Sequence, residues 1–138
     1  MNTYSMFKVD ETKEKHGIWV RYGDIGDFLV ARVGSGSSDF DRLWKVKRKP
    51  YRRQIEQEII DDKVFSHLLL ETFASTALLG WRNVRDANDC EIPFSRTNAV
   101  ELLTDLPELG LALFNAASDY QNFLIGEREE YAKNYETA

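Results

Sequence analysis

Hydrophobic and polar residues alternate near the N-terminus in a pattern typical of a β-hairpin. Two runs rich in β-branched and aromatic residues, 18–22 and 28–33, flank a short segment that contains two glycines. Strand alternation places Ile18 and Val20 on one face of this hairpin and Trp19 on the other. The sequence therefore predicts an N-terminal hairpin with one apolar face directed into a core.

A helical pattern follows a connector rich in glycine and serine. Ser38 or Asp39 is a suitable N-cap for a helix that reaches about Arg48. Pro50 disfavours helical geometry at the residue before it, so we expect a break between this helix and the next.

The longest apolar periodicity in the chain extends from residue 55 to residue 79. Its apolar residues recur at three- and four-residue steps, the spacing that gives a helix one continuous apolar stripe. The pair Asp61-Asp62 allows a split into two helices, of which the second starts at Asp62. Gly80 is expected to end the second helix.

A second hairpin and two further helices are predicted in the C-terminal half. The segments 81–84 and 90–94 flank a polar turn, Ser95 is a natural N-cap for a helix over about 96–104, and Pro107 is a good first residue for a last helix. The predicted fold class is α+β and mainly α-helical, with a helical core, an N-terminal β-hairpin and a second short hairpin.

The length of 138 residues corresponds to one domain. Residues 1–16 are polar and of mixed charge, which indicates a flexible arm. We expect residues 17–126 to form a single helical domain with β-hairpins, and residues 127–138 to be a charged, frayed C-terminal tail.

The charge is distributed unevenly along the chain. Up to Arg53 there are 12 Lys/Arg against 7 Asp/Glu, and from Gln54 onward there are 6 against 16, which gives +5 and −10 and the net charge of −5. Opposite charges on two parts of a molecule can attract copies of it or steer a charged partner.

The basic segment 45–53 is interleaved with aromatic residues, a mixture that binds phosphates and stacks on bases. The acidic balance of the whole chain is unlike that of most nucleic-acid-binding domains, so we do not expect nucleic acid as the main partner. A nucleic-acid-associated accessory protein that uses residues 45–53 remains the alternative interpretation.

The residues suited to catalysis or metal binding are too few and too scattered to predict a site. The chain has two histidines, His16 and His67, and one cysteine, Cys90, in an acidic turn that disfavours a reactive thiolate. We therefore expect no catalytic site, no metal and no cofactor, and no enzyme activity. No signal peptide and no apolar run long enough for a membrane span are visible.

Several segments in fixed order resemble the tail assembly chaperones of long-tailed bacteriophages. The resemblance covers about residues 17–134. It lies in the following segments: the Gly-x-Trp-Val hairpin at residues 17–20, Phe28-Leu29-Val30-Ala31-Arg32, the basic segment around Pro50-Tyr51, Gly80-Trp81-Arg82-Asn83-Val84, Ile92-Pro93-Phe94-Ser95, Asn98-Ala99, Glu101-Leu102-Leu103, Ala116-Ala117-Ser118-Asp119, Asn122-Phe123 and Lys133-Asn134.

The resemblance implies a protein that binds the tape measure protein, keeps it soluble and recruits tail tube subunits. It also implies self-association, action in the host cell cytoplasm and absence from the mature virion. The chain would be the shorter, non-frameshifted product of its gene. As a hypothesis, the contacts with other proteins are assigned to Trp19, Trp44, Arg48, Arg52 and Trp81.

Overall fold

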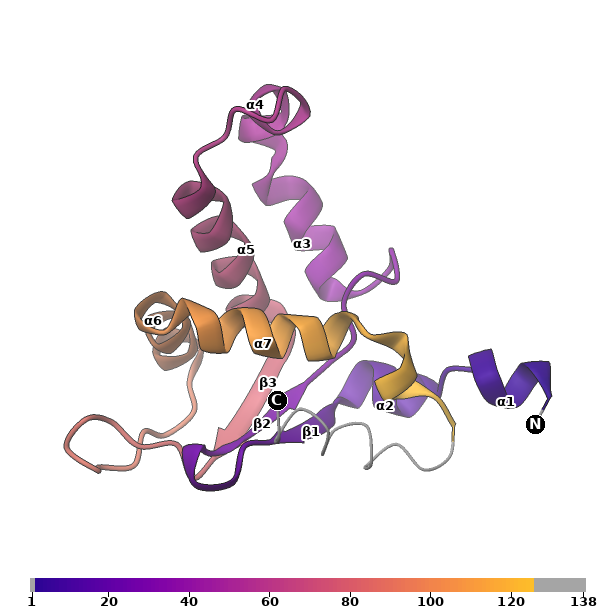
Figure 1. The fold of residues 1–138 in the computed structure, drawn as a ribbon, viewed down its shortest axis with the longest axis vertical. Helices are drawn as coiled ribbons and strands as arrows, with labels where there is room; N and C mark the ends of the chain where they lie inside the picture. Colours follow the sequence, from indigo (N-terminus) through magenta and orange to yellow (C-terminus); the bar gives the residue numbers. More distant parts are fainter. Residues whose placement is uncertain (1, 126–138) are drawn as a thin grey trace.

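The computed structural model describes residues 2–125 (Figure 1), so the predicted charged tail at 127–138 lies outside the described residues. The elements in chain order are α1 (Thr3–Phe7), α2 (Glu11–His16), β1 (Ile18–Arg21), η1 (Gly23–Ile25), β2 (Asp27–Val30), α3 (Asp39–Lys47), η2 (Lys49–Tyr51), α4 (Arg52–Glu56), α5 (Asp62–Thr76), β3 (Leu78–Arg82), α6 (Arg96–Asp105), α7 (Pro107–Ser118) and η3 (Tyr120–Phe123). The predicted fold class, mainly α-helical α+β, is confirmed.

The sheet is antiparallel, with strand order β1-β2-β3. The predicted N-terminal hairpin is confirmed as β1 and β2, with Val20 opposite Phe28, and β3 adds Trp81 opposite Phe28 on the other side. Alternation buries Ile18 and Val20, as predicted, whereas Trp19 faces the other way and is half-buried.

Strand β3 corrects two predictions. Helix α5 ends at Thr76, and Gly80 lies inside the strand instead of ending the helix. The apolar periodicity continues into the strand because Leu78 faces the same core as the helix. The predicted second hairpin is reduced to an isolated bridge between Arg85 and Glu91, with backbone hydrogen bonds from the Asp86 amide to Cys90 and from the Ile92 amide to Val84. Trp81, predicted as part of that hairpin, pairs with Phe28 of β2 instead.

Capping side chains fix where the helices begin. The side chain of Ser38 accepts a hydrogen bond from the Asp41 amide at the start of α3, and Asp61 and Ser95 cap α5 and α6 in the same way. Pro107 is the first residue of α7. The predicted starts at Ser38, Ser95 and Pro107 and the split at Asp61-Asp62 are thereby confirmed.

Residues 2–16 form two short helices where the sequence predicted a flexible arm. Asn2 caps α1 and Asp10 caps α2 through their side chains. The Asp10 amide also donates to the Phe123 carbonyl at 2.7 Å, and Glu14 forms an ion pair with Arg32 at 2.6 Å. These bonds fasten α2 to the body, although neither α1 nor α2 has a buried residue.

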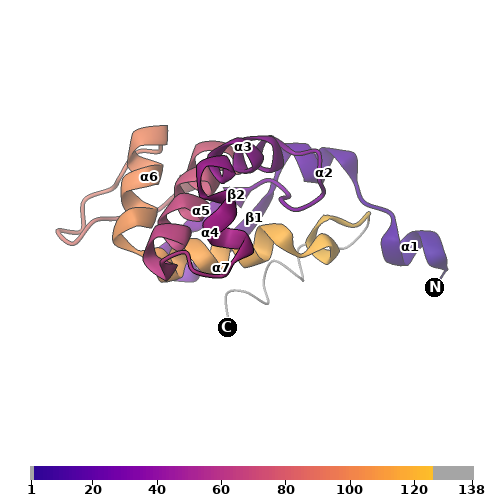
Figure 2. The ribbon, with the colours of Figure 1, turned by 90° about the horizontal axis from the view of Figure 1, so that it is seen from above.

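The helices pack on one face of the sheet, and one helical pair projects from the body. Figure 1 shows α7 crossing the base of a hairpin formed by α3 and α5, with α4 at its far end, and Figure 2 shows α6 and α1 at opposite ends of the molecule. Gly110 allows α7 to lie close to α5, because an added Cβ would meet the Leu70 side chain at 2.8 Å. The core is completed by the following fully buried side chains: Phe28, Phe73, Leu78, Leu103, Leu113 and Phe123.

Candidate protein-binding surfaces

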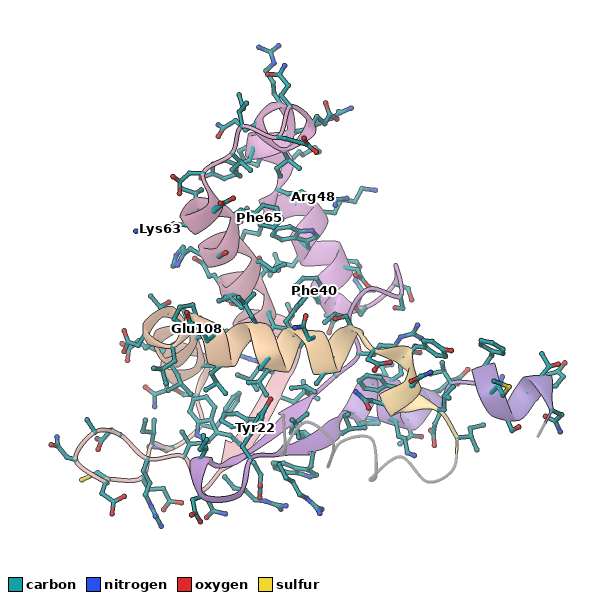
Figure 3. The ribbon with its side chains drawn as sticks, viewed as in Figure 1. Tyr22, Phe40, Arg48, Lys63, Phe65 and Glu108 are labelled. Atoms are coloured by element: carbon teal, nitrogen blue, oxygen red, sulfur yellow. The ribbon has the colours of Figure 1, made fainter. Side chains whose placement is uncertain are left out.

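The projecting pair of helices, residues 39–76 and called here the helical hairpin, is held together by aromatic rings. Phe40 stacks on Trp44 with ring centroids 6.1 Å apart, and Trp44 packs edge-on against Phe65 of α5 at 5.5 Å. Lys47 and Glu71 add an ion pair at 3.4 Å between the same two helices. Trp44, proposed as a contact residue, therefore joins α3 to α5. Figure 3 shows Phe40 on α3 and Phe65 on α5, the two rings that Trp44 contacts.

A carboxylate fixes the base of the helical hairpin. The Asp41 side chain accepts hydrogen bonds from the amides of Gly34 and Gly36 at 3.0 and 2.9 Å and from the Ser38 hydroxyl at 2.7 Å. Burial raises the pKa of Asp41, but these hydrogen bonds stabilise the charged form more strongly, and its pKa lies below the ordinary value of 3.8. The connector before α3 is therefore wrapped around one charged group.

The far end of the helical hairpin combines basic and apolar side chains, and we call it the basic tip. It consists of Lys45, Val46, Arg48, Lys49, Arg52, Arg53, Ile59 and Val64. Val46, Ile59 and Val64 have exposed fractions of 64%, 66% and 41%. These exposed apolar side chains make the far end of the helical hairpin a candidate contact surface.

The charged groups of the basic tip are mostly without acidic partners. Arg52 forms an ion pair with Glu56 at 3.0 Å one helical turn away. Within residues 2–125, Lys45, Arg48, Lys49 and Arg53 make no ion pair. Of the two arginines proposed for contacts, Arg48 is therefore the one whose charge is available to a partner.

Trp19 lies on the outer face of the sheet, away from the basic tip. It stands opposite Leu29 in the register, and Leu29 stands opposite Gly80, where an added Cβ would meet only open space. The Arg82 guanidinium lies 4.1 Å from the centre of the Trp19 ring. Trp19 and Leu29 are both half-buried, so this face keeps an apolar row that a partner can cover.

Trp81 does not belong to either surface. It is 8% exposed, and its indole Nε1 donates to the Ile92 carbonyl at 2.7 Å. Its ring packs edge-on against Phe28 and Phe94. Trp81 is therefore part of the core, and the contact role proposed for it stays a prediction.

The histidine and cysteine candidates for chemistry lie apart in the structure. His67 Nε2 is 3.3 Å from a carboxylate oxygen of Glu71 on the same helix, and Cys90 is exposed in the loop before α6. Residues 2–125 bring together no group of three His, Cys, Asp or Glu side chains able to hold a metal. None of the helices within that range has the length and apolar character needed for a membrane span.

Comparison with known proteins adds one decisive match. Residues 35–134 match the family described as YdaY prophage protein. The chain belongs to this family. It is accordingly a phage-derived protein, and the matched range includes the helical hairpin and α6 to η3 but not β1 and β2. No curated protein and no solved structure gives a significant match to it.

The apolar residues of the basic tip in this YdaY family member, Val46, Ile59 and Val64, were not proposed as contact residues from the sequence. Ile59 was placed on the apolar stripe of a long helix, but the turn between α4 and α5 leaves it exposed. Val46 lies between Lys45 and Lys47, and this flanking by charge was the signal that a solvent-facing apolar residue was present.

We predict that Asp41→Asn destabilises the protein at neutral pH. An amide cannot accept all the hydrogen bonds that the carboxylate accepts, and we expect a loss of about 1–3 kcal/mol in the free energy of unfolding. Because the folded-state pKa of Asp41 is lowered, its contribution is present above pH 3.8 and is lost as the pH falls through the folded-state value.

Urea unfolding at pH 7 and in the acid range measures this effect. The difference between wild type and Asp41→Asn should shrink toward the lowest pH at which the protein is folded. Asp24→Asn, at an exposed carboxylate in the hairpin turn, is the matched control and should change stability little. Equal midpoints for wild type and Asp41→Asn at pH 7 would contradict the assigned role.

Proposed function

We propose that this phage-derived protein is a tail assembly chaperone. It binds the tape measure protein, keeps it soluble and recruits tail tube subunits while the tail is built. It acts in the host cell cytoplasm, leaves before the virion is complete and makes or breaks no covalent bond.

The observation that carries this proposal is the outer face of the sheet, where the half-buried side chains of Trp19 and Leu29 form an apolar row. At the basic tip, Val46 and Ile59 add exposed apolar side chains that can contact other proteins. Membership of a prophage family and the resemblance to tail assembly chaperones direct that binding to tail components.

The tape measure protein is assigned to the outer face of the sheet. A long tape measure helix exposes an apolar stripe that must be covered until tail tube subunits surround it. Such a helix binds a partner through apolar side chains spaced three and four residues apart. Trp19 and Leu29 supply an apolar row, and the open space above Gly80 leaves room for a helix to approach. Each copy would cover a short stretch, and many copies would cover the whole helix.

Co-expression with the tape measure protein of the same phage tests this proposal. We expect the wild-type chain to raise the soluble fraction of the tape measure protein severalfold. Trp19→Ser should lose this effect, because it removes the largest apolar side chain of the outer face. Ile25→Ser, which changes an apolar residue of 62% exposed fraction at the hairpin turn, should keep it.

Two outcomes would count against the proposal at different levels. A tape measure protein that stays equally insoluble with and without the wild-type chain would contradict the chaperone function. Full activity of a folded Trp19→Ser variant would leave the function standing and move the contact away from the outer face. Circular dichroism of each variant separates loss of binding from loss of fold.

A nucleic-acid-associated phage accessory protein is the second candidate. It is favoured by the unpaired charges of Lys45, Arg48 and Lys49, which lie close together in sequence beside Trp44. Binding of this kind loses affinity steeply as salt rises, since phosphate contacts release counterions.

A gel-shift titration with duplex and single-stranded DNA distinguishes the two candidates. We expect no shift at physiological salt, because the net charge of −5 opposes binding to a polyanion. A salt-sensitive shift that Arg48→Glu abolishes would replace the chaperone proposal with the nucleic-acid function.

A further inference from the structure

A second exposed surface resembles the basic tip in layout but carries the opposite charge. It lies where α6 ends and α7 begins, and we call it the acidic corner. It consists of Glu101, Asp105, Leu106, Glu108 and Leu111. Leu106 and Leu111 have exposed fractions of 49% and 38%, and Glu108 lies one helical turn before Leu111 on the same face of α7.

The carboxylates of the acidic corner have no cationic partners nearby. Glu101, Asp105 and Glu108 are exposed, and none of them forms an ion pair with any residue in the range 2–125. The corner thus presents three unpaired negative charges around two leucines. The basic tip presents unpaired positive charges around Val46, whereas Glu58, Asp61 and Asp62 lie at the turn next to Ile59 and Val64.

The two surfaces cannot meet within one molecule. Figure 1 shows α4 at the far end of the helical hairpin and the start of α7 at its foot, and Figure 3 places Arg48 and Glu108 correspondingly far along the hairpin and at its base. The hairpin is held straight by the aromatic seam of Phe40, Trp44 and Phe65, so its tip is kept away from the corner.

We infer that the basic tip of one copy docks on the acidic corner of a second copy. Complementary charge selects this pairing, and contact between Val46 and Leu106 or Leu111 removes apolar surface from water on both sides. Tip-to-tip and corner-to-corner pairings are disfavoured, since each brings together like charges.

Because this contact joins two different surfaces, an open assembly keeps one free basic tip at one end and one free acidic corner at the other. Such heterologous contacts build rings or open helical chains instead of closed pairs. An open chain of this kind would present the outer sheet face of every copy at a regular spacing along a long partner. The docking does not need the tape measure protein, so it can be tested separately from the proposed function.

Charge-reversal variants of the full chain, measured by sedimentation velocity at low salt, test the inference. Arg48→Glu with Arg53→Glu reverses the tip, and Asp105→Lys with Glu108→Lys reverses the corner. Arg53 is used instead of Arg52 because Arg52 is already paired with Glu56. Each double variant should weaken self-association about tenfold or more, because like charges then face each other.

Mixing provides the decisive arm of the experiment. When the tip-reversed and corner-reversed variants are combined, the native tip of one meets the native corner of the other, and the two reversed surfaces match as well. Association should therefore return in the mixture and weaken as salt rises. Lys8→Glu with Lys15→Glu, at exposed positions near α2, changes the net charge as much as the tip reversal and should leave association unchanged.

Three results would overturn the inference. The first is a wild-type chain that stays monomeric at low salt and high concentration. The second is an equal loss of association in the Lys8→Glu, Lys15→Glu control. The third is a mixture of the two charge-reversed variants that stays as dissociated as each variant alone.

Discussion

The packing of Phe40 is the interaction on which the rest of the structure depends. Phe40 is 4% exposed and contacts Trp44 of its own helix, Phe73 of α5 and Phe114 of α7. These contacts join the helical hairpin to the helix that covers the sheet. Aromatic pairs in this edge-on and tilted geometry contribute about 0.5–1.5 kcal/mol each beyond the burial of their area. Without this junction the basic tip would have no fixed direction relative to the body.

The fixed direction of the helical hairpin matters because the proposed contact surfaces depend on where their side chains lie and not on a chemical reaction. The basic tip is held at a distance from the acidic corner, and the outer face of the sheet is a third, separate surface. One small domain therefore has separate surfaces for the two partners that we propose, a neighbouring copy and a long helical protein. Individual exposed ion pairs contribute only about 0–1 kcal/mol. An assembly built from them is reversible, which fits the proposed role as a chaperone that leaves the finished tail.

Local signals in the sequence predicted a large part of the fold. The cap at Ser38, the split at Asp61-Asp62 and the helix start at Pro107 depend on neighbouring residues, and all three are confirmed. The capping residues Asn2 and Asp10 were also present but were read as part of a flexible arm. Part of strand β3 was predicted at residues 81–84, but its start at Leu78 and its pairing with β2 were missed. That pairing joins segments nearly fifty residues apart, which helical periodicity cannot reveal.

The surfaces were harder to predict than the fold, since exposure depends on tertiary packing. Trp44 and Trp81 look alike in sequence, yet Trp44 joins two helices and Trp81 is core. Native mass spectrometry of the tape measure protein purified with this chain tests the account most directly. We predict that several copies of this chain are bound to each tape measure protein and that they dissociate as the salt concentration rises. A tape measure protein recovered without any bound copy would contradict it.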